Sequence, residues 1–535
     1  MDVNTSSLKY LAFLNGKIIT IDKNDRIVEA VLIVNDKIAA VGSNKEIEEL
    51  LPRGAVKVDL GGRTVIPGLI DSHVHMELTV NHLTNAVSAH VPGVKNLTDI
   101  FNRIKERAAK TPKGEWIIVR GSCYLGAKIT EGRMPTKAEL DAIAPEHPVV
   151  IDNEIHMVVM NTLAIEKMGW HFETWLPPNA TLGRDQKTGE LNGMYGEVWK
   201  FLPYNPWGYD NLLETLRKGA IKHYVSRGIT SAHELPYSID GIRCWQQLKN
   251  EGDLPLRLRL YLEHPNLIKL DKLLDLGLTK GFGDEWLCLG GLKLFVDGVG
   301  AHANGHPFED ICFTQEELDE VVYKAHAAGL HIWTHVITPT AIRMGIKAYE
   351  KALKRLPRKD HRLRLEHMAD DLQYWEDAEE MTRKVKELEI VPIGTPQFIH
   401  TVFRKNGMQM RSLIDQGFIL PGNTDTTGSE PEACDPWHTI WVSVTRKNHF
   451  GKVLSPDQCI TPLEAIRMNT LWAAWGGFEE QIKGSIEPGK LADIVVLGED
   501  PLTVDPDALK TMPVELVLVG SKVKHVSDKF QGVLD

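Results

Sequence analysis

The sequence predicts an α/β fold: a (β/α)8 TIM barrel, a small β-sandwich built from both termini, and a large insertion after the first barrel strand. Three observations lead to this prediction. Apolar segments of strand length alternate with helical segments through the middle of the chain, both ends carry short strands separated by turns, and one connection is far too long for a loop. A chain of 535 residues, 43% of them hydrophobic, is long enough to bury such a core.

Short strands separated by turns make up both ends of the chain. Asn15-Gly16 lies between two apolar runs, a pattern typical of a hairpin because a type I′ turn needs positive φ at both central residues. Near the other end, Gly520-Ser521 interrupts an apolar run in the same way. Because neither end has enough strands for a core of its own, we expect residues 1–67 and 478–535 to form one β-sandwich. Two unrelated β edges are the alternative.

The middle of the chain, residues 68–477, is expected to form the barrel. Helical stretches separate most of the apolar segments, and eight strand-then-helix units favour a closed parallel barrel over an open sheet. The connection that spans about residues 80–215 is too long for one loop, which predicts an inserted subdomain. The eight expected strands are Val65–His75, Gly228–His233, Leu256–Leu262, Leu289–Val296, Leu330–His335, Leu363–His367, Ile390–Ile393 and Phe418–Asn423.

Composition excludes several classes of protein. The chain has 61 Lys plus Arg against 72 Asp plus Glu, a net charge of −11, which argues against binding to nucleic acid or to an anionic membrane. Its six cysteines include no CxxC pair, which excludes cysteine zinc ribbons and fits a reducing compartment. The N-terminus lacks the pattern of a signal peptide, and no apolar run reaches the length of roughly 18 residues that spans a membrane. We therefore expect a cytoplasmic protein.

Polar side chains close several of the expected strands, at the face of a barrel where chemistry takes place. His73 and His75 share one face of a strand because side chains alternate, so both imidazoles can bind one ion. Among 21 histidines this spacing alone is uninformative, but His335 and His367 close two later strands and strengthen the metal interpretation. Asp425 follows the eighth strand and can ligate a metal or accept a proton. Its alternative role is a loop-starting or helix-capping aspartate.

Lys293 lies within an expected strand whose other face is apolar. Leu292 and Leu294 should pack on helices, which points Lys293 into the barrel. Burial lowers the pKa of a lysine and favours the neutral, nucleophilic amine. Such an amine can add carbon dioxide to give a carbamate, an anionic ligand able to bridge two cations. The alternative is a lysine paired with Asp297. Walker A, GxGxxG, GxSxG and HExxH motifs are all missing from the sequence, which strengthens the metal interpretation.

The order His-x-His, Lys, His, His, Asp on eight barrel strands resembles the metal-dependent amidohydrolase superfamily. The chain is more closely similar to amidohydrolase family 3, the branch similar to N-substituted formamide deformylase, and the likeness covers essentially the whole chain. The resemblance implies a terminal β-sandwich, a large insertion after strand one and usually a metal-bound hydroxide. The segments that carry the resemblance are Val65–His75, Gly228–His233, Gly291–Asp297, Glu366-His367 and Gly484–Val496.

With this resemblance, the ligand set predicts hydrolysis of an amide or related non-peptide C–N bond at a binuclear metal centre. A metal-bound hydroxide attacks the substrate carbonyl, and Asp425 serves as general base and then general acid. Zn²⁺ is the expected metal, with two ions per chain bridged by carboxylated Lys293. One ion is expected on His73, His75 and Asp425, and the other on His335 and His367.

The sequence predicts the residues that contact substrate less specifically than it predicts the metal ligands. His156, in the insertion, matches a family histidine near the cavity, and Tyr124, His302 and Gln397 are further candidates, each with a structural role as its alternative. Aromatic residues of the insertion predict a small-molecule substrate with a bulky or apolar group. Two other functions remain open: a single-metal, deaminase-like hydrolase in which Lys293 is structural, and a catalytically silent regulatory protein on the same fold. Analogy with relatives implies a homodimer.

Overall fold

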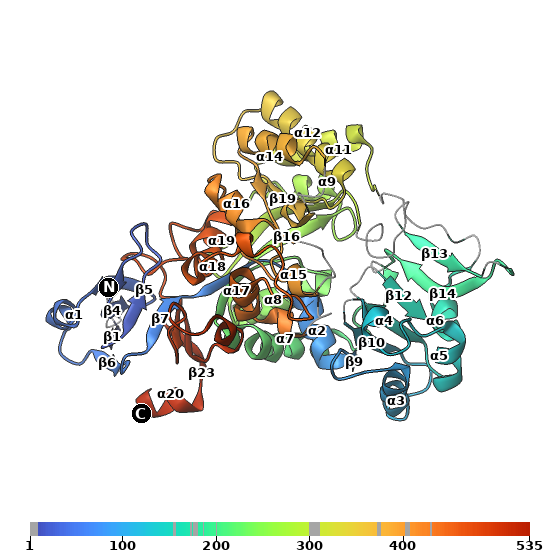
Figure 1. The fold of residues 1–535 in the computed structure, drawn as a ribbon, viewed down its shortest axis with the longest axis horizontal. Helices are drawn as coiled ribbons and strands as arrows, with labels where there is room; N and C mark the ends of the chain where they lie inside the picture. The colour runs from blue at the N-terminus through green and yellow to red at the C-terminus, as the bar shows by residue number, and fades with distance from the viewer. Residues whose placement is uncertain are drawn as a thin grey trace, which may run out of the picture.

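A curled parallel sheet of seven strands forms the centre of the molecule (Figure 1). The strand order is β20-β19-β18-β17-β16-β15-β8, and every neighbouring pair is parallel. This arrangement is a TIM-barrel-like α/β fold, and it brings the carboxyl ends of the strands to one face. The strands are β8 Leu69–Val74, β15 Ile229–Glu234, β16 Arg257–His264, β17 Leu287–Phe295, β18 His331–His335, β19 Arg364–Glu366 and β20 Val391–Pro392.

Apolar side chains of the strands and of the helices between them make up the largest hydrophobic core. In α12, for example, Ile342, Ile346 and Tyr349 recur at helical spacing and are buried. No helix in the described parts of the chain is long and apolar enough to cross a membrane. The helices of this part are α2 Met76–Asn85, α7 Tyr209–His223, α8 Ile239–Glu251, α9 Leu270–Asp275, α11 Gln315–Ala327, α12 Pro339–Arg355, α13 Met368–Asp371, α14 Ala378–Glu387, α15 Phe398–Thr401, α16 Met410–Asp415, α17 Pro436–Thr445, α18 Pro462–Met468 and α19 Leu471–Gly476.

This computed structural model describes most of the chain. The described residues are 9–122, 124–153, 157–171, 174, 180–185, 187–198, 201–298, 311–371, 376–401, 407–427 and 431–534.

The segment predicted as the eighth strand, Phe418–Asn423, is not a regular strand. It still lies beside β8, because Ser72 N donates to Gly422 O at 3.1 Å and Asp425 N donates to His73 O at 2.9 Å. A continuous ladder cannot form, since proline has no N–H to donate at Pro421 and Gly422 N donates to Met468 O instead.

The segment 418–423 is connected to the end of β20 through the side chain of Asn423, and not through a backbone ladder. Asn423 Nδ2 donates to Gly394 O at 2.9 Å, and Thr395 Oγ1 donates to Asn423 Oδ1 at 2.9 Å. These bonds place the segment between β8 and the end of β20, so Asp425 comes to the same face as the strand ends.

The first predicted strand, Val65–His75, is divided into two. β7 Thr64–Pro67 pairs with β21 in a terminal sheet, whereas β8 belongs to the central sheet. Gly68 stands at the junction, and a Cβ atom there would lie 2.1 Å from Thr230 Oγ1. Only glycine therefore fits where the chain passes from one sheet to the other.

Strands from both ends of the chain form two further sheets, at the left in Figure 1. One has four strands in the order β5-β4-β1-β6, and the other has six in the order β23-β22-β21-β7-β2-β3. Buried side chains of both sheets share one hydrophobic cluster. The elements are β1 Tyr10–Leu14, β2 Lys17–Ile19, β3 Ile27–Val28, β4 Ala30–Val34, β5 Lys37–Gly42, α1 Asn44–Leu50, β6 Val56–Asp59, β21 Ile494–Leu497, β22 Val514–Val519, β23 Lys522–Val526 and α20 Asp528–Leu534.

The two expected turns of these sheets have different outcomes. Gly520 and Ser521 have φ of 56° and 60° and join the antiparallel pair β22 and β23, as a type I′ turn does. The hairpin predicted at Asn15-Gly16 is wrong, because β1 pairs with β4 and β6 whereas β2 pairs with β3 and β7. The chain crosses between sheets at this point.

A separate sheet lies between α2 and α7 in sequence, at the right in Figure 1. Its six strands follow the order β13-β14-β12-β11-β10-β9. We call this sheet and its helices the insertion sheet. Its elements are β9 Val87–Ala89, α3 Leu97–Ala108, β10 Ile117–Gly121, α4 Leu125–Lys128, α5 Lys137–Ile143, β11 Val149–Asn153, β12 Met157–Met160, α6 Thr162–Lys167, β13 Thr181–Arg184 and β14 Leu191–Gly196.

Candidate metal centre

Three imidazoles surround the carboxylate of Asp425 at the carboxyl ends of the central strands. Asp425 Oδ1 lies 3.6 Å from His73 Nε2 and 3.5 Å from His75 Nε2, and Oδ2 lies 3.5 Å from His367 Nε2. Three potential ligand atoms lie within 4.8 Å of one another, one each from His73, His367 and Asp425. We call these four residues the histidine–aspartate cluster.

Lys293 points into the barrel, as expected. Its side chain is fully buried, and Nζ lies 3.2 Å from His73 Nε2. Burial lowers the pKa of Lys293 to about 8, which increases the fraction of neutral amine near neutrality. The carboxylate of Asp297, the alternative partner of this lysine, accepts hydrogen bonds from the backbone N–H groups of Ile337 and Thr338.

His335 lies at the far side of the same group of rings. Its ring centroid is 4.6 Å from that of His367, and its Nε2 is 3.8 Å from Asp297 Oδ1. The six residues that the sequence singled out as ligands therefore meet at one face of the sheet. His335 stands next to His367 and Asp297 and joins the cluster through ring contact.

A buried carboxylate orients His73. His73 Nδ1 lies 2.7 Å from Glu366 Oε2, and Arg364 donates to both oxygens of Glu366, with Nε to Oε1 at 2.7 Å and Nη2 to Oε2 at 2.9 Å. With the ring proton on Nδ1, Nε2 of His73 is left as an acceptor facing Asp425 and Lys293. The guanidinium of Arg364 in turn lies 3.8 Å from the ring of Trp333.

Two cluster residues have strained backbone conformations. His367 has a φ of 70° and Asp425 has a φ of 44°, in the left-handed region that side chains with a Cβ rarely adopt. Surrounding contacts hold both: His367 Nδ1 lies 3.3 Å from Asp370 Oδ2, and Asp71 accepts from Thr424 N at 3.0 Å. Strain of this kind is concentrated at functional sites.

The charge states of the cluster suit a divalent cation. Burial lowers the pKa of His73 to about 3, and the ammonium of Lys293 adds to this effect. The ring is therefore neutral near neutral pH and can offer a nitrogen lone pair to a metal ion. Burial by itself would raise the pKa of Asp425, but the neighbouring imidazoles outweigh it and hold this pKa below its usual range. Neutral imidazole nitrogens and an ionised carboxylate are the donors that Zn²⁺ takes in proteins. The residues present therefore fit a divalent metal.

The four expected substrate contacts have different outcomes. His156 and His302 lie outside the described residues. Gln397 is buried and precedes Phe398, whose ring stacks on that of His367 with centroids 6.0 Å apart. Tyr124 begins α4 of the insertion sheet with a φ of 53°. A role for either side chain in binding substrate stays a prediction.

The residues that support the cluster were not among those predicted from the sequence. Asp71 lies two positions before His73 on the same strand face, and Arg364 and Glu366 share a face of β19. A charged side chain that points inward from an apolar strand needs a buried partner, and this signal was present in the sequence. Asp370 lies outside the strands and carries no comparable local signal.

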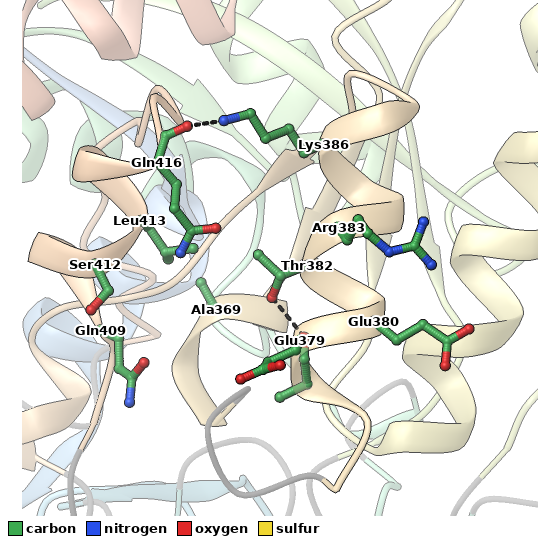
Figure 2. Close-up of a pocket in the computed structure, with 11 residues that line it drawn as sticks. Ala369, Glu379, Glu380, Thr382, Arg383, Lys386, Gln409, Ser412, Leu413 and Gln416 are labelled. Carbon is green, nitrogen blue, oxygen red and sulfur yellow. Dashed lines mark hydrogen bonds between the residues drawn. The ribbon is translucent and has the colours of Figure 1, made fainter.

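One cavity lies away from these residues (Figure 2). It has a volume of about 840 Å³ and lies between α14 and α16, with Arg383, Lys386 and Gln416 among its lining residues. The ammonium of Lys386 donates to the backbone carbonyl of Gln416 across it. None of the cluster residues lines this groove, so it is not the candidate site.

Comparison with known proteins gives a consistent result. A model of the amidohydrolase family matches residues 57–525. The N-substituted formamide deformylase of Arthrobacter pascens is 25% identical over 97% of this chain and 99% of its own length.

Two solved structures extend the comparison. The crystal structure of a metal-dependent hydrolase from Pyrococcus horikoshii OT3 superimposes with a TM-score of 0.72 at 25% identity, covering 93% of this chain and 99% of that one. Atrazine chlorohydrolase of Arthrobacter aurescens TC1, solved in complex with zinc, has a TM-score of 0.57 at 14% identity, with coverage of 98% and 100%. The second likeness concerns the fold alone.

Proposed function

Because this chain belongs to the amidohydrolase family, we propose that the histidine–aspartate cluster is the active site of a metal-dependent hydrolase that cleaves an amide or related non-peptide C–N bond. The observation that carries the proposal is the convergence of imidazoles on Asp425 beside the buried amine of Lys293. The name of the deformylase relative supports the same bond class.

We propose a binuclear centre. His73, His75 and Asp425 would hold one ion, and His335 and His367 the other, with carboxylated Lys293 between them. The short approach of Lys293 Nζ to His73 Nε2 supports a bridging position for this side chain. Zn²⁺ is the proposed metal, since imidazole and carboxylate donors suit it and a structural relative was solved with zinc.

The protein's own groups divide the work of hydrolysis. A divalent ion in this site supplies Lewis acidity, which polarises the substrate carbonyl and lowers the pKa of water. Asp425 accepts the proton of the attacking water and returns it to the departing amine, as general base and then general acid. Because its pKa is held below the usual range, this carboxylate is ionised near neutral pH, which is the form that can take up a proton. Glu366 keeps the proton of His73 on Nδ1, so Nε2 faces the reaction.

Two further features belong to the proposal. We propose a small-molecule substrate with a bulky or apolar group, bound between the strand ends and the insertion, with Tyr124 and Gln397 among its contacts. We also propose that residues 68–477 form the catalytic barrel, with an insertion at about 80–215. Residues 1–67 and 478–535 would together form a β-sandwich. Finally, we propose that two chains associate into a homodimer.

A single-ion centre is the second candidate. One observation favours it: His73, His367 and Asp425 bring their ligand atoms together around one point, whereas His335 approaches Asp297. In this case Lys293 stays an amine, and the chemistry is that of a deaminase-like hydrolase. Elemental analysis of purified protein distinguishes one ion per chain from two.

Replacement of Asp425 by Asn tests the catalytic proposal. The amide keeps one oxygen for metal coordination but cannot accept the proton, so turnover should fall by at least about a hundredfold. Metal content should stay close to that of the unmodified protein. Activity would be measured on a panel of N-substituted amides, with hydrolysis by the unmodified chain as the reference.

Other outcomes have clear meanings. Near-normal turnover by the Asp425→Asn variant would remove Asp425 as the general base. A protein that binds metal but hydrolyses no member of an amide, ester and lactone panel would favour a catalytically silent role on the same fold.

A further inference from the structure

A buried ion pair of the insertion sheet lies next to the segment that carries Asp425. Arg120 on β10 and Asp152 on β11 stand opposite each other in the ladder, and Nη1 of Arg120 pairs with Oδ2 of Asp152. Their side chains are 0% and 4% exposed. A guanidinium has five N–H groups, and one carboxylate cannot satisfy all of them, so a buried arginine needs further acceptors.

The further acceptors lie in the barrel. Arg120 Nη2 donates to the backbone carbonyl of Thr427 at 2.8 Å and to Thr427 Oγ1 at 2.7 Å. Thr427 stands two residues after Asp425. One buried side chain of the insertion sheet is therefore bonded, through two acceptors of a single residue, to the loop that carries the proposed general base.

This loop needs support from outside, because Asp425 has a φ of 44°. The barrel supplies one side of that support. Asp425 N donates to His73 O at 2.9 Å, and the carbonyl of Thr426 accepts from His75 N at 3.3 Å and from Thr79 Oγ1 at 2.8 Å. These bonds come from β8, from α2 and from His75 between them. Arg120 adds two bonds from the insertion sheet, both to Thr427.

We propose that Arg120 is a positioning residue for hydrolysis: held by Asp152, it fixes Thr427 and thereby keeps the Asp425 carboxylate among the imidazoles. The proposal rests on the proposed function of Asp425. Without this clamp the left-handed turn relaxes, and the carboxylate leaves its contacts of 3.5–3.6 Å with the rings of the cluster. The insertion is then part of the catalytic apparatus as well as a wall of the substrate pocket.

Three variants test the clamp. Arg120→Lys keeps a positive charge beside Asp152 but has a single nitrogen in place of the planar fork, in which Nη1 pairs with Asp152 while Nη2 donates to Thr427. Thr427→Val removes only the hydroxyl acceptor. Arg257→Met is the matched control, because Arg257 forms an equally buried pair with Asp493, with side chains 1% and 4% exposed and Nε 2.8 Å from Oδ2, at the amino end of β16.

Two measurements are made on the metal-loaded full chain: hydrogen exchange of the backbone amides of residues 423–427, and kcat and KM for a hydrolysed amide. In Arg120→Lys we expect exchange in this segment to be about tenfold faster and kcat to be about tenfold lower with KM little changed. Thr427→Val should shift both in the same direction by a smaller factor. Arg257→Met should lower the stability of the whole protein and leave kcat and the relative protection of 423–427 unchanged.

Each outcome decides the proposal. Faster exchange in 423–427 together with lower kcat supports it. Unchanged exchange in that segment overturns it, as does faster exchange with unchanged kcat, or an equal loss of kcat in Arg257→Met. If Arg120→Lys does not fold, Thr427→Val carries the same comparison. If the unmodified chain hydrolyses nothing, the proposed function has failed, and the exchange data still show whether Arg120 holds the segment.

Discussion

Replacing Glu366 with glutamine should weaken metal binding at the cluster, because Glu366 accepts three hydrogen bonds and an amide cannot. His73 Nδ1, Arg364 Nε and Arg364 Nη2 all direct hydrogens at its two oxygens, at 2.7, 2.7 and 2.9 Å. Glutamine presents an NH2 group in place of one oxygen, so a donor faces a donor whichever way the amide is turned. Both Glu366 and Arg364 are 0% exposed, so water cannot repair the mismatch.

The two orientations of the amide give the magnitude. In both orientations the buried guanidinium of Arg364 loses its counter-charge and faces NH2 with one of its donors, and breaking a buried pair costs about 3–5 kcal/mol of stability. If NH2 faces His73, the ring changes to the tautomer protonated on Nε2, and that nitrogen is lost as a ligand. Loss of such a supporting carboxylate lowers metal affinity by about tenfold to a hundredfold, or roughly 1.4 to 2.7 kcal/mol.

The assay measures Zn²⁺ affinity by competition with a chromophoric chelator and the free energy of unfolding by urea titration. Asp493→Asn is the control, since it removes the carboxylate that Arg257 pairs with outside the cluster and should cost stability without changing metal affinity. The reasoning is refuted if Glu366→Gln loses as much stability as this control while its metal affinity stays within about twofold of the unmodified protein.

Three other changes have definite expected results. Lys293→Met should reduce the ions bound per chain from two to one by elemental analysis, and an unchanged count would contradict a bridging carbamate. Gly68→Ala places a Cβ 2.1 Å from Thr230 Oγ1 and 2.7 Å from Thr230 Cβ, which should cost about 1–3 kcal/mol; adding Thr230→Ala, which removes Oγ1 but keeps Cβ, should recover only part of this loss in urea titrations. Burial by itself would raise the pKa of Glu479, but Arg259, Lys483 and His233 together outweigh it and hold this pKa well below its usual range. This carboxylate therefore stabilises the fold above its unfolded pKa of about 4.3, and the stabilisation is lost as pH falls through the folded pKa; Glu479→Gln should be less stable near neutral pH with a flatter acid dependence.

The meeting of distant residues at one face could be predicted, because the rule behind it is general. Strand alternation places His73 beside His75, and parallel strands bring their carboxyl ends to one side. Lys293, His367 and Asp425 then follow from the apolar segments around them. The class of fold, a TIM-barrel-like α/β chain, could be predicted from the same alternation.

Pairing partners could not be predicted from local patterns. Asn15-Gly16 has the local chemistry of a hairpin, yet β1 and β2 join different sheets, because tertiary packing pairs β1 with β4 and β6 and pairs β2 with β3 and β7. Phe418–Asn423 has the apolar content of a strand, but Pro421 and the bond from Gly422 N to Met468 O interrupt its ladder. Both errors come from contacts between residues far apart in the sequence.

The supporting residues were hidden for a different reason: each acts through a partner on another element. Glu366 could be recognised as buried from its strand, but its role depends on His73, which is 293 residues away. Arg120 gives no sign in the sequence that it reaches Thr427, 307 residues away. Single-residue patterns predict which side chains point inward, and only the fold shows which of them meet.

Charge balance links the number of bound ions to the state of Lys293. Around the cluster the carboxyl groups of Asp71, Asp297 and Glu366 are buried and that of Asp425 is 10% exposed, and the four outnumber the buried cation of Arg364 even when Lys293 is protonated. Burial raises the pKa of Asp71 and of Asp297 to about 7, so each of these two groups is only partly ionised near neutral pH.

The ammonium of Lys293 loses one proton before the neutral amine adds carbon dioxide, and the resulting carbamic acid loses a second proton to solvent, so the local charge changes from +1 to −1. That change of two charges equals the charge of one divalent ion, so carboxylation and a second ion should stabilise each other. A preparation depleted of bicarbonate should therefore lose one ion per chain and the carbamate signal in ¹³C spectra together. Two ions retained without a carbamate would show that the excess carboxylates alone supply the balance, and Lys293 would then be a structural residue.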